Sequence, residues 1–247
     1  MSGSEEALPE SVVELARAKL TLSLRVTGVR ADGYHLLDSE MVTLDLSDRL
    51  TISAGTGLRV TGLGAHGSVP DDGENLVARA LRLLGRTAAV HLEKHIPTGA
   101  GLGGGSADAA AILRWGGCAD PAVAARLGAD VPFCLVGGRA RVRGVGEVVE
   151  PLPFDEVAGS EYTLLTPPLH VSTVEVYRAW DRLGGPAGAS GNDLEPAALH
   201  VEPELAYWRD RLGEASGESP RLAGSGGTWF VPGSHPGPDR LVVRVAR

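Results

Sequence analysis

The stretch from Pro97 to Leu113, PTGAGLGGGSADAAAIL, constrains the fold more than any other part of the chain. Glycines at 99, 101, 103, 104 and 105 form a loop, and an alanine-rich run typical of a helix follows Ser106, its predicted N-cap. The preceding residues 90–96, VHLEKHI, alternate apolar and polar side chains as a half-buried strand does. A strand, a glycine loop and a helix start predict an anion site, because backbone N–H groups converge there without interference from Cβ atoms.

This loop differs from an ordinary P-loop at the position of the phosphate-binding lysine. The spacing from Gly99 to Gly104 and the position of Ser106 fit G-x-x-x-x-G-K-[ST], but Gly105 stands where the lysine belongs. The loop backbone can hold phosphates, yet phosphoryl transfer would need a cation from elsewhere. The same glycines fit G-x-G-x-x-G, a weak sign of a dinucleotide fold, and a flexible linker is the simplest alternative.

Only two of the 23 basic residues are lysines, Lys19 and Lys94. A compact ammonium approaches a phosphate or a developing oxyanion differently from a planar guanidinium. Lys94 ends the strand that leads into the glycine loop, and Lys19 shares one face of an alternating segment with Thr21. Both lysines are candidates for the missing cation, and chance retention is the alternative.

Composition excludes several classes of function. A net charge of −8 and scattered basic residues argue against a nucleic-acid or membrane-surface binder. Cys118 and Cys134 form neither a metal pattern nor a disulfide framework, which favours a reducing compartment and a packing role for both thiols. The acidic residues 1–10 match no signal peptide or anchor, and no apolar run reaches the ~20 residues that span a bilayer. We expect a cytoplasmic protein with one large domain or two modest ones.

Periodic patterns divide the first half of the chain into elements. Residues 18–27 alternate as a strand, and Asp32-Gly33 signals a turn before strands within 40–52. Residues 54–73 predict a hairpin with a loop, and residues 74–86 an amphipathic helix. Another helix opens at Asp120-Pro121 and stops at Gly128.

Asp130 is notable because it follows this helix and precedes Pro132 in an otherwise apolar stretch. Its carboxylate is either a helix or turn cap or a buried acid kept for chemistry, and the local sequence leaves both interpretations open. A closing hairpin over 137–152 and an acidic loop around 153–161 place a domain boundary near residue 156. The remainder alternates strands with helices at 171–183 and 203–217, separated by a loop at 184–195, and ends in strands on either side of a glycine turn at 224–227.

Four segments together resemble the GHMP small-molecule kinases. They run from ARAKL to DRLTI (16–52), PTGAGLGGGSADAAAIL (97–113), LGADVPF (127–133) and LAGSGGTWF (222–230). The DGYH segment at 32–35 and LGADVP narrow the resemblance to members that use ATP and Mg²⁺ to phosphorylate a hydroxyl of a cytidine diphosphate polyol in isoprenoid precursor synthesis. The resemblance implies an α+β fold of two domains, ribosomal protein S5-like over 1–156 and ferredoxin-like over 157–247, in a monomer or homodimer.

The resemblance also implies roles for the motif residues. Lys19 and Asp130 match the catalytic pair, in which Asp130 accepts the proton of the acceptor hydroxyl and Lys19 supplies the cation that the loop lacks. Stacking of cytosine between Tyr34 and Tyr177 is expected. The implied ATP-binding set is Asn75, Lys94, Pro97, Gly99, Gly101, Leu102, Gly103, Gly104, Gly105 and Ser106, with Asn75 and Lys94 at the adenine. The implied substrate-binding set is Thr21, Tyr34, His35, Thr173, Tyr177, Gly224, Ser225 and Gly226.

The chain departs from the family pattern in places. Arg17 stands where the family has proline, Thr21 stands where members usually carry asparagine, and the second half is short. A threonine offers only a hydroxyl, so its hydrogen bonding to substrate or to Asp130 differs from that of asparagine. These changes leave the catalytic pair in place.

Other classes of function stay open. A dinucleotide oxidoreductase needs its glycine loop directly after the first buried strand, whereas residues 1–96 precede this loop. A non-catalytic nucleotide-binding protein on the same scaffold is the better rival, and it would tolerate replacement of Lys19 or Asp130. Homoserine and mevalonate kinases share the glycine loop but should lack the DGYH segment.

Overall fold

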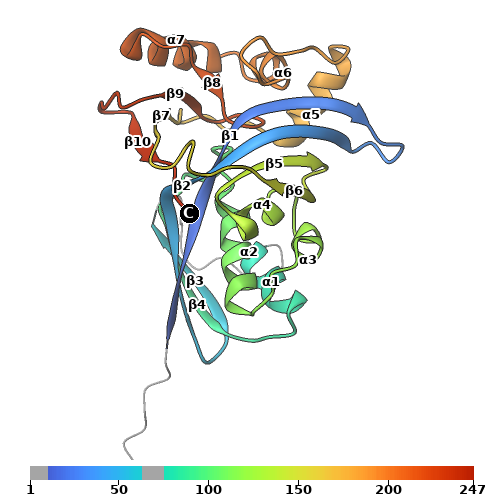
Figure 1. The fold of residues 1–247 in the computed structure, drawn as a ribbon, viewed down its shortest axis with the longest axis vertical. Coiled ribbons are helices and arrows are strands. Elements are labelled where there is room, and N and C mark those ends of the chain that lie inside the picture. The colour runs from blue at the N-terminus through green and yellow to red at the C-terminus, as the bar shows by residue number, and fades with distance from the viewer. Residues whose placement is uncertain (1–10, 63–74) are drawn as a thin grey trace, which may run out of the picture.

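The computed structural model describes residues 11–62 and 75–247, which form two sheets and seven helices (Figure 1). The first sheet contains β1 (Val12–Val29), β2 (His35–Ser53), β3 (Gly57–Gly62), β4 (Ala89–Lys94), β5 (Arg139–Gly144) and β6 (Val148–Pro151). It is accompanied by α1 (Leu76–Leu83), α2 (Gly104–Trp115), α3 (Pro121–Ala125) and α4 (Val131–Val136). The second sheet contains β7 (Glu161–Leu165), β8 (Arg221–Leu222), β9 (Trp229–Pro232) and β10 (Leu241–Arg244), with α5 (Thr173–Arg182), α6 (Glu195–Val201) and α7 (Leu205–Ser216).

A long antiparallel ribbon of β1 and β2 organises the molecule. It extends from Val12 opposite Ile52 to Val29 opposite His35. Along its other edge β2 pairs with β5 near its start and with β4 near its end, and both pairings are antiparallel. β3 runs parallel to β4, and β6 forms a hairpin with β5. Helices α1 to α4 lie together beside this ribbon, while α5 to α7 accompany the second sheet (Figure 1).

Three apolar cores hold these layers together. One core packs the first sheet against α1, α2 and α4, and another packs the second sheet against α5 to α7. The third lies between the two sheets and includes Leu20 and Leu44 of the ribbon, Phe230 of β9 and Leu102 of the glycine loop. The loop therefore belongs to the packed interior on one side, which fixes its position relative to both sheets.

Several predicted elements are confirmed. β4 covers most of the alternating segment 90–96, β5 and β6 form the closing hairpin, and α5 lies within the helix predicted at 171–183. Cys134 is buried and Cys118 is half-buried, and both are free thiols. No helix in the described ranges is long and apolar enough to cross a membrane. The expectation for residues 1–10 lies outside the described residues.

Some local predictions are wrong. Residues 57–62 form β3, which runs parallel to β4, and residues 63–73 of the hairpin predicted within 54–73 lie outside the described residues. Ser106 is not the N-cap of α2, since that helix begins at Gly104 after Gly103, whose φ of 70° and missing side chain preclude side-chain capping. α3 ends at Ala125 rather than Gly128. The loop predicted for 184–195 is confirmed up to residue 194, but the helix α6 that follows it was not predicted. The division at residue 156 stays a prediction.

Candidate active site

The glycine loop is held against β1 at Lys19. Gly99, Gly101 and Gly103 have φ values of 74°, 74° and 70°, which side chains with a Cβ rarely adopt. The Lys19 N–H donates a hydrogen bond to the Leu102 carbonyl at 3.0 Å. A Cβ on Gly103 would lie 2.8 Å from Lys19 Cγ, so the lysine stem fills the space that this glycine leaves open.

The second glycine turn, Gly224–Gly227, packs against the first loop at backbone distance. A Cβ on Gly101 would lie 2.5 Å from the Ala223 carbonyl oxygen and 2.6 Å from that of Gly226. A Cβ on Gly227 would lie 2.5 Å from the Gly99 carbonyl oxygen. The two loops can approach this closely only because both contact positions, Gly101 and Gly227, lack a Cβ.

Lys19 and Asp130 form an ion pair between these loops. The Lys19 Nζ lies 3.3 Å from an Asp130 carboxylate oxygen and donates a hydrogen bond to the Thr21 hydroxyl at 3.0 Å. Lys19 and Thr21 are buried, whereas the Asp130 side chain is 33% exposed. Asp130 occupies the N-cap position of α4 but makes no capping hydrogen bond. The carboxylate is therefore neither a cap nor fully buried, and it is accessible to a substrate while a buried cation holds it.

A cavity of about 430 Å³ opens beside Asp130. It brings together Tyr34 of the turn before β2, His35 at the start of β2, and Thr173 and Tyr177 of α5. Ala129, the neighbour of Asp130, lines it as well. The Thr173 hydroxyl is hydrogen-bonded to the Ser225 hydroxyl at 2.8 Å, which links this cavity to the second glycine turn. Four residues from distant parts of the chain thus surround one space, and their role in binding stays a prediction.

His35 is held from two sides in this cavity. Its Nε2 lies 2.8 Å from an Asp181 carboxylate oxygen, and its ring centroid lies 4.7 Å from that of Tyr177 and 5.5 Å from that of Trp180. Burial, with a smaller contribution from the charge of Asp130, raises the pKa of the Tyr177 phenol, so this hydroxyl stays a hydrogen-bond donor at neutral pH. Tyr34 is 62% exposed, and the Arg30 guanidinium lies over its ring, 5.9 Å from the ring centroid.

Lys94 lies beneath the start of α2 in a buried group of charges. Its ammonium pairs with Asp48 and with Asp108, the latter at 2.7 Å. Asp48 also accepts hydrogen bonds from the backbone N–H groups of His95 and Ile96. Burial lowers the pKa of Lys94, but the charges and hydrogen bonds of Asp108 and Asp48 outweigh burial and raise it. Of the two lysines, only Lys19 faces the accessible carboxylate of Asp130.

The other predicted ATP-binding residues have clear structural positions. Asn75 caps α1 by accepting a hydrogen bond from the Val77 N–H at 2.8 Å. Leu102 is buried, so only its backbone could contact a nucleotide. Gly105 is exposed in the first turn of α2, and Gly104 lies over Lys94, since a Cβ there would be 3.3 Å from the Lys94 Nζ. Contacts of these residues with ATP stay a prediction.

Comparison with known proteins places this arrangement in a family. Residues 75–138 match the GHMP kinases N terminal domain. The 4-diphosphocytidyl-2-C-methyl-D-erythritol kinase of Paracoccus denitrificans (strain Pd 1222) is 42% identical over 236 residues, which cover 88% of this chain and 85% of that protein. The chain belongs to the 4-diphosphocytidyl-2-C-methyl-D-erythritol kinase family of GHMP kinases.

Solved structures agree with this family and with its fold. A crystal structure of 4-(cytidine 5'-diphospho)-2C-methyl-D-erythritol kinase superposes with a TM-score of 0.72 at 36% identity and covers 91% of both chains. Homoserine kinase from Cytophaga hutchinsonii superposes with a TM-score of 0.64 at 21% identity and covers 99% of this chain and 97% of its own. The second match shows the shared GHMP kinase fold alone, and the expected α+β class is confirmed.

Three aspartates in and beside the candidate site were not predicted from the sequence. Asp181 orients His35, and Asp48 and Asp108 hold Lys94. Asp108 carried a usable signal, since it is the only charged residue in the alanine-rich run 107–113, whose side chains the structure buries. Asp181 follows Tyr177 by four residues and so lies on the same helix face, but nothing local distinguishes it from a solvated acid.

Proposed function

We propose that this chain transfers the γ-phosphoryl group of ATP to the 2-hydroxyl of 4-diphosphocytidyl-2-C-methyl-D-erythritol. The observation that carries the proposal is the Lys19–Asp130 pair, which lies between the glycine loop and the cavity of Tyr34, His35 and Tyr177. The substrate follows from the relatives, because members that share about two fifths of their residues over most of the chain bear the name of this kinase.

The glycine loop would bind the phosphates of ATP. Gly103 and Gly104 lie where α2 begins, so the free N–H groups of its first turn and its partial positive charge face the loop. The first turn of α2 contains no acidic residue that would oppose an anion there. Backbone donors in fixed positions stabilise charge without reorganisation during the reaction.

Asp130 and Lys19 would carry out the transfer. Asp130 accepts the proton of the substrate 2-hydroxyl while the oxygen of that hydroxyl bonds to the γ-phosphorus of ATP. The bond between the γ-phosphorus and the β–γ bridging oxygen breaks at the same time, which releases ADP. The buried ammonium of Lys19 holds the carboxylate in position and faces the negative charge of the phosphoryl group. Thr21 accepts a hydrogen bond from the ammonium and so takes the place of the usual asparagine as an acceptor.

The expected metal is Mg²⁺ bound to ATP. In the described ranges no group of three or more His, Cys, Asp or Glu could hold a metal. Mg²⁺ is commonly held by one or two protein oxygens together with the phosphates of a nucleotide. The Ser106 hydroxyl in the first turn of α2 would hold it, and the bound ion would neutralise phosphate charge.

The cavity beside Asp130 would hold the cytidine group. Tyr34 and Tyr177 offer aromatic faces, and His35 offers ring nitrogens whose orientation Asp181 determines. Because Tyr34 is largely exposed, it gains contact area when a base covers it. Thr173 and Ser225 lie at the end of the cavity toward the glycine loops, on the path that the diphosphate would take.

Release of ADP with different acceptors tests the proposal. The assay supplies ATP and Mg²⁺ with 4-diphosphocytidyl-2-C-methyl-D-erythritol, homoserine, mevalonate or no acceptor. We expect turnover with the cytidine compound alone. Turnover with homoserine or mevalonate would reassign the acceptor, and ATP binding without turnover on any acceptor would favour a non-catalytic nucleotide-binding protein.

A further inference from the structure

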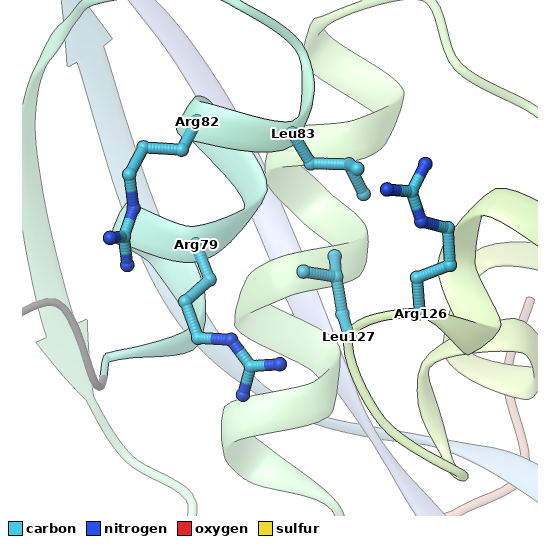
Figure 2. A pocket seen from close by; sticks show the side chains of 5 residues that line it. All are labelled: Arg79, Arg82, Leu83, Arg126 and Leu127. Carbon is cyan, nitrogen blue, oxygen red and sulfur yellow. The ribbon is translucent and has the colours of Figure 1, made fainter.

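A second cavity, of about 560 Å³, lies between α1 and the end of α3. Its lining residues are Arg79, Arg82, Leu83, Arg126 and Leu127. Figure 2 shows Arg79 and Arg82 on α1, Arg126 across from them, and Leu83 and Leu127 between. None of these residues belongs to the glycine loop, to the Lys19–Asp130 pair or to the cavity of Tyr34 and His35.

The guanidinium groups of Arg79 and Arg126 have no counter-charge within residues 11–62 and 75–247. Over these ranges neither forms an ion pair or a side-chain hydrogen bond, whereas Arg139 and Arg141 of β5 each pair with at least one carboxylate. Arg82 is exposed and directed away from Leu83 and Leu127, and it does not carry the argument (Figure 2). Arg79 and Arg126 line this hollow from different elements, and its lining residues include no acid.

The shape of the hollow suits an anion attached to a less polar group. A guanidinium presents a planar fork of donors that matches the oxygens of a phosphate, and two forks from different elements can bind one phosphate from two directions. Leu127 is buried and Leu83 is half-buried, so the floor between the arginines is apolar. An anion here would also relieve the repulsion between the like charges.

We propose that this cavity is a binding site for a small phosphate-bearing metabolite, separate from the active site. Arg79 and Arg126 bind the phosphate, and the remainder of the ligand lies on Leu83 and Leu127. The site depends only on these contacts, so it stands whether or not the chain has the kinase activity proposed above.

The test measures phosphate binding while the active site is filled. Isothermal titration calorimetry is performed on the full chain with saturating ADP and Mg²⁺, with inorganic phosphate in one arm and n-butyl phosphate in the other. We expect both to bind, and n-butyl phosphate to bind more tightly because of the apolar floor. The Arg79→Gln/Arg126→Gln variant should lose at least about tenfold in affinity for both, as expected when charge-assisted hydrogen bonds are removed.

Arg59→Gln is the matched control, since Arg59 is an exposed arginine of β3 outside this cavity. It should bind both phosphates as the unmodified chain does, and thermal unfolding without phosphate checks that all variants are folded. Absence of binding to the unmodified chain would overturn the site. Equal affinity in the double variant and the control would also overturn it, because the phosphate would then bind elsewhere.

Discussion

At the scale of single residues, the ion pair of Lys19 and Asp130 explains how a glycine loop without its own lysine can serve phosphoryl transfer. The cation comes from β1 and the carboxylate from the start of α4, 3.3 Å apart. Because Lys19 is buried and Asp130 is a third exposed, the pair presents its acid and not its cation to the solvent side. This arrangement is expected of a base that a neighbouring charge positions.

Replacement of Asp130 tests that role. Asp130→Asn keeps the shape but removes the proton acceptor, so we expect kcat to fall by about 10²- to 10⁴-fold with little change in the KM for ATP. Steady-state ADP release measures both constants. Asp120→Asn is the control, because Asp120 is an exposed helix cap and asparagine also caps well. Residual activity of Asp130→Asn above about a tenth of normal would exclude Asp130 as the base.

Asp181 should act on substrate binding through His35. Removal of its carboxylate in Asp181→Ala frees the His35 ring, so we expect the KM for the cytidine substrate to rise about three- to tenfold while kcat changes little. Asp181→Asn keeps an acceptor oxygen and should restore most of the affinity. Arg182→Gln on the same helix, which is exposed and does not line the cavity, is the control. A fall in kcat with an unchanged KM would contradict a positioning role.

At the scale of elements, the two glycine turns act as one structural unit. Each turn fills the space that the other leaves open, and Lys19 passes beside both, since a Cβ on Gly224 would lie 3.4 Å from its Nζ. The geometry of the proposed phosphate site is thus set by packing between the start of α2 and the turn before β9, which lie far apart in the sequence.

Alanine substitutions can separate this packing from backbone strain. Gly101→Ala places a Cβ against two carbonyl oxygens, and we expect it to lower the free energy of unfolding by about 3 to 4 kcal/mol and to weaken ATP binding. Gly117→Ala has a similar φ of 77° but open space, so it should lose only about 1 kcal/mol. Urea unfolding compares the two variants. Equal losses would mean that φ alone, and not the contact between the turns, accounts for the effect.

The order of elements around the glycine loop could be predicted from the sequence, because a strand, a glycine run and an alanine-rich helix each have a strong local pattern. The start of α2 could not be predicted, because Ser106 has the side chain of a typical N-cap. The positive φ of Gly103 instead makes the helix begin at Gly104, two residues before Ser106. The pairing of β3 could not be predicted, because its parallel partner β4, with Ala89 opposite Gly57, lies far along the chain and leaves no local signal. The cavity residues Tyr34 and Tyr177 were identified from family motifs, whereas Asp181 depends on a tertiary contact with His35.

At the scale of the whole molecule, the β1–β2 ribbon connects the two halves of the site. Leu24 of β1 packs in the core of α5 to α7, and its backbone exchanges hydrogen bonds with Gly191 and Asp193. The Asp193 carboxylate accepts further hydrogen bonds from Arg25 and from the Val26 N–H. A single strand thus carries Lys19 to the glycine loop and anchors the half that supplies Thr173 and Tyr177.

Global stability should depend on pH through Asp108. The single ammonium of Lys94 lies between the two buried carboxyl groups of Asp48 and Asp108, so it does not stabilise the two carboxylates equally. Burial raises the pKa of Asp108 to about 7, with the nearby Asp48 adding to this and Lys94 opposing it. One Asp108 oxygen is buried without a hydrogen-bond partner in the described part of the chain, which is consistent with a site for a proton.

Between about pH 4 and pH 7 the unfolded chain releases this proton while the folded protein keeps it. The contribution of Asp108 to the free energy of unfolding is therefore greatest below pH 4 and falls as the pH rises, by at most about 1.4 kcal/mol per pH unit, and then levels off. Asp108→Asn cannot titrate, so the unfolding free energy of the unmodified chain minus that of the variant should fall from pH 4.5 to pH 7 and stay constant above. Urea unfolding at several pH values measures this difference, with Asp120→Asn as the exposed control. A difference that stays constant from pH 4.5 to pH 7 would instead mean that Lys94 keeps Asp108 ionised in the folded protein, because the unfolded chain has lost this proton by about pH 4 as well.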